Sequence, residues 1–494
     1  VFGSDHSDTE VLLHGWREWG LGRLAYGDLS DEYAAGLCSR LDGMFAFAMW
    51  DARAARLCMA RDQHGEKPLY VTYGPDGPED DRLFAFASTG AALLRWRAAL
   101  GGSITWREMG GEWLRVGYAA SAGPVREVWP RRTLTLGPGL GLFGRGDHQV
   151  AGEPLVSRAE AGYEPAGSIP NDPELSTVRW ARTEELTLDR ADALFRDAVR
   201  GRVEADVPIG CFLSGGVDSS LVAHYAAEAL GDIRTFTVKM PDAAYDESAY
   251  AEAVAAAIGG GVTHRTLACD ARPADDLAAL IERLGLPFGD SSLLPSLWVS
   301  RATRGCVTVA LSGDGGDEMF AGYERYLAAP VLARYGWLLR MLPAELLAAK
   351  DPRSRSSKLR RLVEAARGLG YLDLGAIFPE RMARAIGAAP EIRATFGGSS
   401  GAFARRDEAI GRAIARDCIS YLPDDLLRKT DTASMHVGLE CRAPILANSV
   451  TAAARSATIA SLMPPGPGGR RKGLLREVAR RHLPAEIVDR PKMG

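Results

Sequence analysis

The pattern of hydrophobic and polar positions changes near residue 186. Before it, a helical pattern at residues 8–16 precedes short apolar runs of strand length at 41–51, 56–62, 68–73 and 83–87. Short strands at hairpin-like spacing, with few long helices between them, predict an antiparallel sheet. Residues 137–185 are rich in Gly and Pro and have no clear period, which predicts a linker.

Beyond residue 186, strand and helix patterns alternate. Helical patterns cover 189–199, 219–230, 247–258, 275–284 and 297–303, and apolar strand patterns cover 209–213, 235–238, 262–267 and 307–311. This alternation predicts an α/β fold with a doubly wound parallel sheet. Residues 325–494 read as mostly helical. We therefore expect an antiparallel domain at 1–140, a linker at 141–185 and a second domain at 186–494.

The composition disfavours some classes of partner and metal but does not indicate a function. A net charge of −4 gives no indication of a nucleic-acid partner, and no apolar run is long enough to span a membrane. Seven cysteines are dispersed without C-x-x-C spacing, which disfavours zinc. Dispersed cysteines in a chain of this size are typical of reduced thiols, so we expect a cytoplasmic protein without a membrane partner.

The segment Leu213 to Ser219, with the sequence Leu-Ser-Gly-Gly-Val-Asp-Ser, joins a predicted strand to a predicted helix. Ser214, Gly215 and Gly216 carry little bulk, so their N–H groups can approach a ligand. Asp218 and Ser219 are suitable helix N-caps. A helix N-terminus behind small residues favours an anion, here a phosphate. The alternative is an ordinary strand-to-helix turn. No Lys follows the glycines, so this is not the common NTPase loop.

The segment Ser312 to Asp317, with the sequence Ser-Gly-Asp-Gly-Gly-Asp, follows the last predicted strand. Its glycines allow tight turns, and the carboxylates of Asp314 and Asp317 can face one point. Carboxylates beside a phosphate-binding turn suit Mg²⁺, which prefers hard oxygen ligands shared with phosphate. A solvated acidic loop is the alternative. Both turns follow strand carboxyl ends, where parallel sheets bind ligands.

Three N-terminal segments, at residues 7–11, 41–51 and 60–70, resemble the glutaminase domain of glutamine-hydrolysing asparagine synthetases. That domain is an N-terminal-nucleophile hydrolase whose catalytic Cys is the first residue. This chain starts at Val1, so we expect an N-terminally incomplete domain; the alternative is an inactive glutaminase. By this resemblance, Asp8 would meet the α-amino group of glutamine.

The two glycine-bearing turns resemble the synthetase domain of the same family, which has the ATP-pyrophosphatase fold. Further segments that match are 286–292, 421–435, 439–444, 472–476 and 490–492. Leu286, Ile445 and Ala447 depart from the usual motifs of the family. The family relatives that form β-lactams carry Tyr where Asp314 stands, which disfavours that branch.

The resemblance implies ATP and Mg²⁺ as cofactors. ATP would place its adenine near the backbone of Val238, and its phosphates would contact the segment from Leu213 to Ser219 with Ser312 and Gly313. Mg²⁺ and pyrophosphate would be held by the carboxylates of the two turns, namely Asp218, Asp314 and Asp317.

Two residues would act directly in catalysis. Lys492 would stabilise charge on the phosphates and the adenylate, and its alternative role is that of a surface lysine. Glu440 would orient or deprotonate the attacking amine, and its alternative role is a structural ion pair with Arg442.

The implied function is AMP-forming synthesis of asparagine from aspartate and glutamine-derived ammonia through β-aspartyl-AMP. One alternative is a related amide or macrolactam synthetase that adenylates another carboxylate. The other is an inactive nucleotide-binding scaffold. The expected partners are aspartate or another carboxylate, with glutamine or ammonia, and a homo-oligomer is left open.

Overall fold

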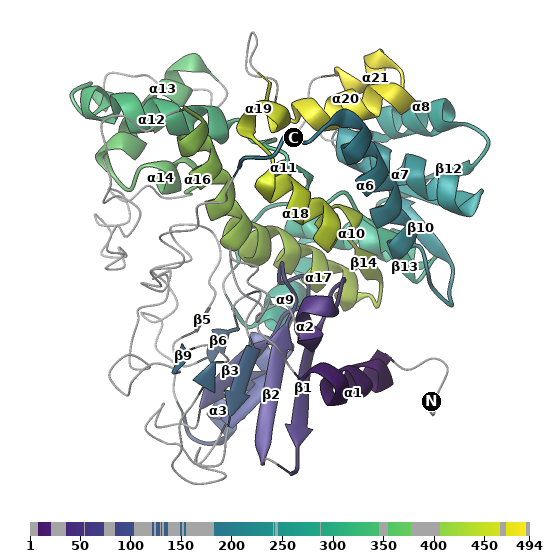
Figure 1. Cartoon of the computed structure of the whole chain (residues 1–494), viewed down its shortest axis with the longest axis vertical. Helices are drawn as coiled ribbons and strands as arrows, with labels where there is room; N and C mark the ends of the chain where they lie inside the picture. The colour runs from purple at the N-terminus through teal and green to yellow at the C-terminus, as the bar shows by residue number, and fades with distance from the viewer. Residues whose placement is uncertain are drawn as a thin grey trace. The chain divides into compact units, whose positions relative to one another are not determined.

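In the computed structural model, short antiparallel strands occupy the N-terminal part of the chain, and a parallel sheet with helices occupies the rest (Figure 1). The chain divides into two units, of which the first holds described residues up to 154 together with Leu284–Phe288. The second holds the other described residues from Arg182 onward. The structure describes residues 8–20, 36–53, 55–73, 84–102, 121–122, 125–128, 130, 133–136, 149–150, 153–154, 182–240, 242, 246–286, 288–344, 354–376, 406–464 and 471–490.

The described residues of the first unit form two antiparallel sheets, with strand orders β1-β2-β7-β8-β9 and β4-β3-β6-β5. Buried Met59, Leu69 and Val128 form one small core. The elements are α1 (Asp8–Trp19), α2 (Leu37–Arg40), β1 (Ala46–Asp51), β2 (Arg56–Arg61), β3 (Tyr70–Tyr73), β4 (Phe84–Ala87), α3 (Gly90–Ala99), β5 (Ser121–Ala122), β6 (Val125–Glu127), β7 (Thr133–Leu136), β8 (Gln149–Val150) and β9 (Glu153–Pro154).

The first sheet extends past residue 140. The short strands β8 and β9 lie within the predicted linker, and β8 pairs with β7. Two-residue strands are held by backbone hydrogen bonds and have no room for an alternating side-chain pattern, so the sequence did not indicate them. The exact domain boundaries stay a prediction.

The described residues of the second unit include a five-stranded parallel sheet of order β12-β11-β10-β13-β14. Every neighbouring pair in it is parallel. Its strands are β10 (Ile209–Phe212), β11 (Ile233–Lys239), β12 (Val262–Ala268), β13 (Val309–Leu311) and β14 (Glu440–Arg442). The α/β class and the parallel sheet are confirmed. The described part of the chain beyond residue 325 is mostly helical, as predicted, and the three-residue strand β14 is an addition that the sequence did not indicate.

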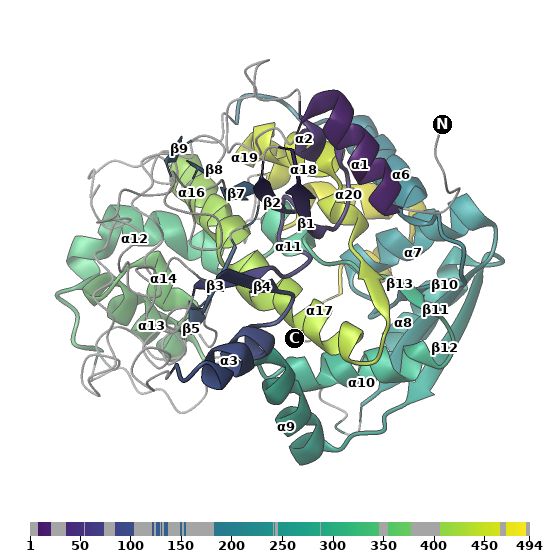
Figure 2. The ribbon, with the colours of Figure 1, turned by 90° about the horizontal axis from the view of Figure 1, so that it is seen from below.

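Helices cover both faces of this sheet, with α7 and α8 on one face and α10 on the other (Figures 1 and 2). The helices are α6 (Leu188–Arg202), α7 (Val217–Leu230), α8 (Ser248–Ile258), α9 (Pro273–Leu284), α10 (Leu293–Arg304), α11 (Gly316–Met319), α12 (Arg325–Leu339), α13 (Arg355–Arg367), α14 (Tyr371–Leu374), α16 (Arg406–Ile419), α17 (Arg428–His436), α18 (Asn448–Ser456), α19 (Ile459–Leu462), α20 (Gly473–His482) and α21 (Ala485–Val488). A π-helical turn, Leu422–Leu427, precedes α17, and a 3₁₀ turn, Pro444–Leu446, precedes α18.

The core of the second unit joins its helices to β10 and β13. Phe195 of α6 packs against Phe320 with ring centroids 5.3 Å apart. Gly210 in β10 has no side chain because a Cβ there would lie 2.4 Å from the ring of Phe236 in β11. A side chain at position 210 would therefore separate β10 from β11.

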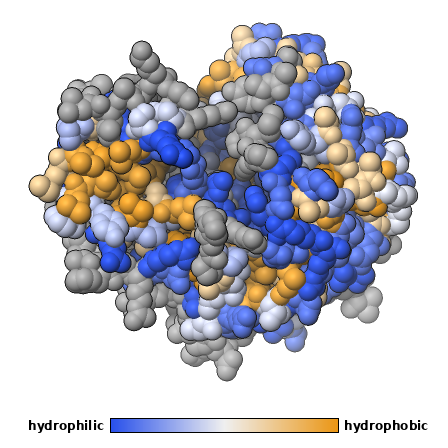
Figure 3. Space-filling model, turned by 90° about the horizontal axis from the view of Figure 1, so that it is seen from above, coloured by the Kyte–Doolittle hydropathy of each residue, from blue (hydrophilic) through white to orange (hydrophobic). Residues whose placement is uncertain are grey.

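The outer surface of the second unit includes an apolar area over α12 (Figure 3). Large exposed side chains there include Tyr335, Trp337 and Leu338, followed by Met341 and Leu342. Within the described ranges, no helix combines the length and apolar character that a membrane span requires.

Candidate active site

The two glycine-bearing loops meet where the strand order of the parallel sheet reverses. β11 and β12 lie on one side of β10, and β13 and β14 lie on the other. Open α/β sheets bind ligands beyond the carboxyl ends of the strands at such a reversal. The loops after β10 and β13 therefore form the candidate site.

Hydroxyl groups hold the turn that follows β10. The Oγ atoms of Ser214 and Ser219 lie 3.1 Å apart, and the N–H of Gly216 donates to Ser214 Oγ at 3.3 Å. Gly215 has a φ of +72°, and a Cβ there would lie 2.8 Å from Cβ of Tyr250. A side chain at this position would therefore clash as well as strain the backbone.

The start of α7 differs from the prediction. The helix begins at Val217 and its N-cap is Gly216, so Asp218 and Ser219 lie in the first turn and are not caps. Glycine provides no side chain to bond the first N–H groups of the helix. Those donors and the helix dipole are therefore directed to a ligand, which is the arrangement that suits a phosphate.

Glycines allow the second loop to pack closely against the first. A Cβ on Gly313 would lie 2.9 Å from Asp218 Cβ, and a Cβ on Gly316 would lie 2.6 Å from Asp218 Cγ. Gly315 between them has a φ of +87° and is the N-cap of α11. Asp218 is thus enclosed by glycines, and the two loops act as one site.

Asp314 is held by two hydroxyl groups on different elements. Its Oδ2 accepts hydrogen bonds from Ser312 Oγ at 3.0 Å and from Thr430 Oγ1 of α17 at 3.1 Å. The backbone N–H of Ser312 donates to the carbonyl of Arg442 at the end of β14 at 2.8 Å. The second loop is therefore anchored to both the sheet and α17.

The carboxylates of Asp218 and Asp317 share one ammonium group, that of Lys472. Lys472 Nζ lies 2.8 Å from Asp317 Oδ1 and forms an ion pair with Asp218 Oδ2. Lys472 is 9% exposed, and burial acts to lower its pKa, but the two carboxylates raise the pKa well above its usual range. A Cβ on Gly322 would lie 1.8 Å from Asp317 Oδ1, so this glycine makes room for the ion pair.

The two carboxylates that face Lys472 also fit a divalent cation. Mg²⁺ is commonly bound by one or two carboxylates plus phosphate oxygens. In the part of the chain that the structure describes, no group of three or more His, Cys, Asp or Glu side chains is arranged to hold a metal. The expected set of metal ligands, Asp218, Asp314 and Asp317, stays a prediction. Mg²⁺ itself stays a prediction.

A buried acid lies beside Asp317. Glu318 is 1% exposed and accepts a hydrogen bond from the hydroxyl of Tyr323. Burial, and then the negative charge of Asp317, raise the pKa of Glu318 to about 8. Glu318 is therefore mostly protonated at neutral pH, and the negative charge of the loop stays on the aspartates.

Arg490 reaches the first loop from the far end of the chain. Its Nε donates to the carbonyl of Gly215 at 3.0 Å and its Nη2 to the carbonyl of Ser214 at 3.1 Å. The guanidinium lies 4.1 Å from the ring centroid of Tyr250. Arg490 thus holds the backbone of the phosphate-binding turn. Lys492, predicted as a catalytic residue, lies outside the described residues.

Comparisons with known proteins match both parts of the chain. The asparagine synthase family model matches residues 190–494, and the glutamine amidotransferase domain model matches residues 2–95. A putative asparagine synthetase (glutamine-hydrolyzing) of Mycobacterium tuberculosis is 30% identical over 100% of this chain and 70% of the relative. Asparagine synthetase (glutamine-hydrolyzing) 1 of Bacillus subtilis is 27% identical over 100% of this chain and 71% of the relative. The amidase chyE of Penicillium rubens is 28% identical over 65% of this chain and 44% of the relative.

The chain belongs to the asparagine synthetase family. The family carries out ATP-dependent amide synthesis, so the chain is a ligase by family, and ATP is the nucleotide of the family. The recognised resemblance, with its glutaminase and synthetase parts, is confirmed.

In this asparagine synthetase family member, two predicted contacts lie on their expected elements. Val238 is buried one residue before the carboxyl end of β11, and the N–H of Leu213 donates to the carbonyl of Phe236 in the same strand at 2.9 Å. Asp8 is the first residue of α1 in the other unit and is exposed. Their binding roles stay predictions.

Glu440 lies at the start of β14, opposite Val309 of β13. Its Oε1 accepts a hydrogen bond from Arg442 Nε at 2.6 Å, and Arg442 Nη1 donates to the carbonyls of Arg202 and Glu204. The structural ion pair considered as its alternative role is therefore present. A catalytic role for Glu440 stays a prediction.

Lys472 was not among the predicted site residues. Two signals could have found it: the Lys-Gly-Leu-Leu-Arg segment, and the scarcity of lysine in a chain that mostly uses Arg as its cation. Its partner Asp218 is 254 residues away in sequence, so only the fold brings them together.

Proposed function

We propose that this chain makes asparagine from aspartate and glutamine-derived ammonia, in an ATP-dependent reaction that forms β-aspartyl-AMP and releases pyrophosphate. The observation that carries the proposal is the buried cation Lys472 between Asp218 and Asp317, directly beside the phosphate-binding turn. An ammonium group next to a site for phosphates can stabilise the charge of a leaving pyrophosphate.

The nucleotide would lie along the edge formed by the two loops. Its phosphates would meet the hydroxyls of Ser214 and Ser219 and the N–H groups at the start of α7, with Ser312 and Gly313 on the opposite side. Its adenine would lie near the backbone of Val238. This placement leaves the α-phosphorus at the reversal of strand order, where an acceptor acid can approach.

The reaction proceeds in two displacements. A carboxylate oxygen of aspartate attacks the α-phosphorus; the bond from that phosphorus to the bridging oxygen breaks, and pyrophosphate leaves with the electron pair. Ammonia then attacks the acyl carbon, loses a proton, and displaces AMP to leave the amide. Lys472 would lower the energy of the first step by neutralising charge on pyrophosphate, as Lys492 would for the adenylate.

Charge balance supports a requirement for Mg²⁺. The two loops carry the carboxylates of Asp218, Asp314 and Asp317 against the one ammonium of Lys472. This excess of negative charge would repel a phosphate chain that arrived alone. When bound, Mg²⁺ supplies charge neutralisation and orientation of the phosphates, and Asp218, Asp314 and Asp317 would hold it.

A second candidate keeps the adenylation but changes the acceptor acid. The similarity to an enzyme named amidase chyE supports considering it. The three departures from the family motifs give little support to a different acceptor acid. Ile445 and Ala447 are buried in the core of the second unit, and Leu286 packs in a core of the first. These residues serve packing, so asparagine synthesis is the better supported function.

The test is carboxylate-dependent exchange of labelled pyrophosphate into ATP, with a panel of acids that includes aspartate. Exchange with aspartate, followed by asparagine formation from ammonium or glutamine, is the expected result. Exchange with a different acid alone would establish the second candidate. ATP binding without exchange for any acid would favour an inactive scaffold. Comparison of ammonium with glutamine tests the glutamine-derived source separately.

A further inference from the structure

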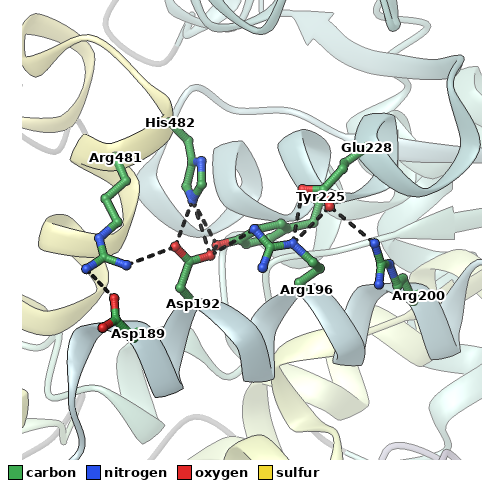
Figure 4. Close-up of polar contacts among 8 residues, drawn as sticks. All are labelled: Asp189, Asp192, Arg196, Arg200, Tyr225, Glu228, Arg481 and His482. Atoms are coloured by element: carbon green, nitrogen blue, oxygen red, sulfur yellow. Dashed lines mark hydrogen bonds and ion pairs between the residues drawn. The ribbon is translucent and has the colours of Figure 1, made fainter.

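A second group of charged side chains joins three helices of the second unit (Figure 4). It lies between α6, α7 and α20, and the described mechanism does not use it. Tyr225 is seven residues beyond Asp218 on α7, which is about 10 Å along the helix axis. The residues drawn are Asp189, Asp192, Arg196 and Arg200 from α6, Tyr225 and Glu228 from α7, and Arg481 and His482 from α20.

Asp192 is the centre of this cluster. It is 7% exposed and accepts a hydrogen bond from the hydroxyl of Tyr225 at 2.7 Å. His482 Nε2 lies 3.2 Å from its Oδ2, and since a carboxylate only accepts, this nitrogen carries the proton. Arg481 Nη1 and Arg196 Nη2 lie 3.3 and 3.4 Å away. Burial acts to raise the pKa of Asp192, but these donors and charges lower it, so the carboxylate stays ionised.

The helices that Asp192 ties together both begin at the candidate active site. α7 carries Asp218 in its first turn, and α20 starts directly after Lys472. His482 is the last residue of α20, ten residues beyond Lys472, or about 15 Å along the axis. A rotation of α20 of only about 4° around its anchored end would move its first residue by about 1 Å. Such a shift is enough to break a contact of 2.8 Å.

Packing alone does not fix the direction of α20. Its buried side chains Leu475, Val478 and Ala479 hold the helix against the core. Apolar contacts of this kind are non-directional, whereas hydrogen bonds have distance and angle preferences. The polar contacts of His482 and Arg481 therefore supply the directional restraint at this end.

The backbone of Lys472 needs such a restraint. Its φ is +53°, in the left-handed region that L side chains rarely adopt. Residues in sparsely populated backbone regions keep them only where the surrounding structure holds them in place. Lys472 is the N-cap of α20, so the position of this helix decides whether the strained residue reaches Asp218 and Asp317.

We propose that Asp192, through Tyr225 and His482, is a positioning residue that holds Lys472 against Asp218 and Asp317. It does so by tying the last residue of α20 to the middle of α7, and the N-terminal ends of these two helices carry the ion pair. The inference rests on the proposed role of Lys472 in binding pyrophosphate. It adds three residues to the machinery of the reaction that contact neither substrate nor nucleotide.

The test compares Asp192→Asn with Asp189→Asn. Both residues are on α6 and both bond Arg481, but the side chain of Asp189 is 88% exposed and forms only a surface ion pair. Asp192→Asn should lower kcat of pyrophosphate exchange about tenfold with KM for the acceptor acid unchanged, and should weaken pyrophosphate binding in calorimetry about as much. Asp189→Asn should change each value by less than about twofold. Tyr225→Phe is a milder variant that should follow Asp192→Asn with a smaller effect.

A double-mutant cycle separates positioning from general stability. If Asp192 acts through Lys472, Asp192→Asn should have no further effect on pyrophosphate binding in a Lys472→Met background. An equal loss in both backgrounds, or equal effects of Asp192→Asn and Asp189→Asn, would overturn the inference. Calorimetry needs no turnover, so an enzyme that binds pyrophosphate but fails exchange with every acid would refute the proposed reaction while still testing the positioning.

Discussion

Replacing Lys472 with Met removes the buried cation that two partly buried carboxylates share. Methionine keeps an unbranched side chain of similar length, so the change is mainly one of charge. The variant leaves Asp218 and Asp317 facing each other without the ammonium that lies 2.8 Å from Asp317. We expect a loss of stability and a new affinity for divalent cations.

The size of the effect follows from the geometry. At 2.8 Å the gross attraction of one such pair is about 6 kcal/mol for an effective dielectric constant of about 20. Part of this is offset by the desolvation of both charges, and removal of one partner from a buried pair typically destabilises by about 3–5 kcal/mol. At about 2 °C per kcal/mol for a domain of this size, the Tm should fall by about 6–10 °C.

Thermal unfolding of the wild type and the variant, with chelator and with millimolar Mg²⁺, measures both effects. Without nucleotide, Mg²⁺ should raise the Tm of Lys472→Met by several degrees and that of the wild type very little, because in the nucleotide-free wild type the ammonium bridges the two carboxylates and no phosphate helps to bind the cation. Lys358→Met is the control, since Lys358 pairs with Glu324 while half exposed and should lose less than about 1 kcal/mol. An unchanged Tm for Lys472→Met, or an equal fall in Tm for the two variants, would show that the ion pairs of Lys472 do not stabilise the fold as proposed.

Three further predictions concern single side chains. Glu318 has a pKa of about 8 against an ordinary value of 4.5, so the stability that it contributes is complete below pH 4.5 and is lost as pH rises from 4.5 through 8. Glu318→Gln should therefore make the Tm less sensitive to pH between about 4.5 and 8. Burial and His482 lower the pKa of His224 from its ordinary value of 6.5, so at falling pH the unfolded chain binds this proton before the folded protein does, and stability is lost below pH 6.5. His224→Gln should reduce this fall in Tm at acidic pH. A Tm that depends on pH in the same way as in the wild type would contradict the prediction. Arg490→Met removes two charged hydrogen bonds to the phosphate-binding turn and should raise KM for ATP about tenfold in exchange assays. Arg490→Lys should have an intermediate effect, because a lysine ammonium cannot make the two parallel hydrogen bonds of the planar guanidinium.

Much of the second unit could be predicted because its signals are local. The run from Ile209 to Ser219 contains a buried strand, a glycine turn and a helix start within a dozen residues, and the structure places β10 and α7 there. The strand β14 could not be predicted in the same way. Glu440–Arg442 is three residues long, and what makes it a strand is its pairing with Val309–Leu311, about 130 residues earlier.

The candidate site was harder to predict where it depends on distant pairs. Lys472 stood within a recognisable motif, but nothing near it in sequence indicates that it bonds Asp218 and Asp317. Asp192 reads as a polar position on the outer face of an amphipathic helix, and only the packing of α20 onto α6 and α7 buries it. The residue types thus predicted a site for phosphate and a cation, whereas tertiary contacts determine which side chains form that site.

The nucleotide product distinguishes release of pyrophosphate from transfer of the γ-phosphoryl group. In the proposed reaction, the two loops and Lys472 bind a leaving pyrophosphate, and no γ-phosphoryl group is transferred. Phosphorus NMR of a reaction with ATP, Mg²⁺, aspartate and ammonium should show AMP and pyrophosphate, each in equal amount to the asparagine formed. Formation of ADP and inorganic phosphate together with the amide would contradict it.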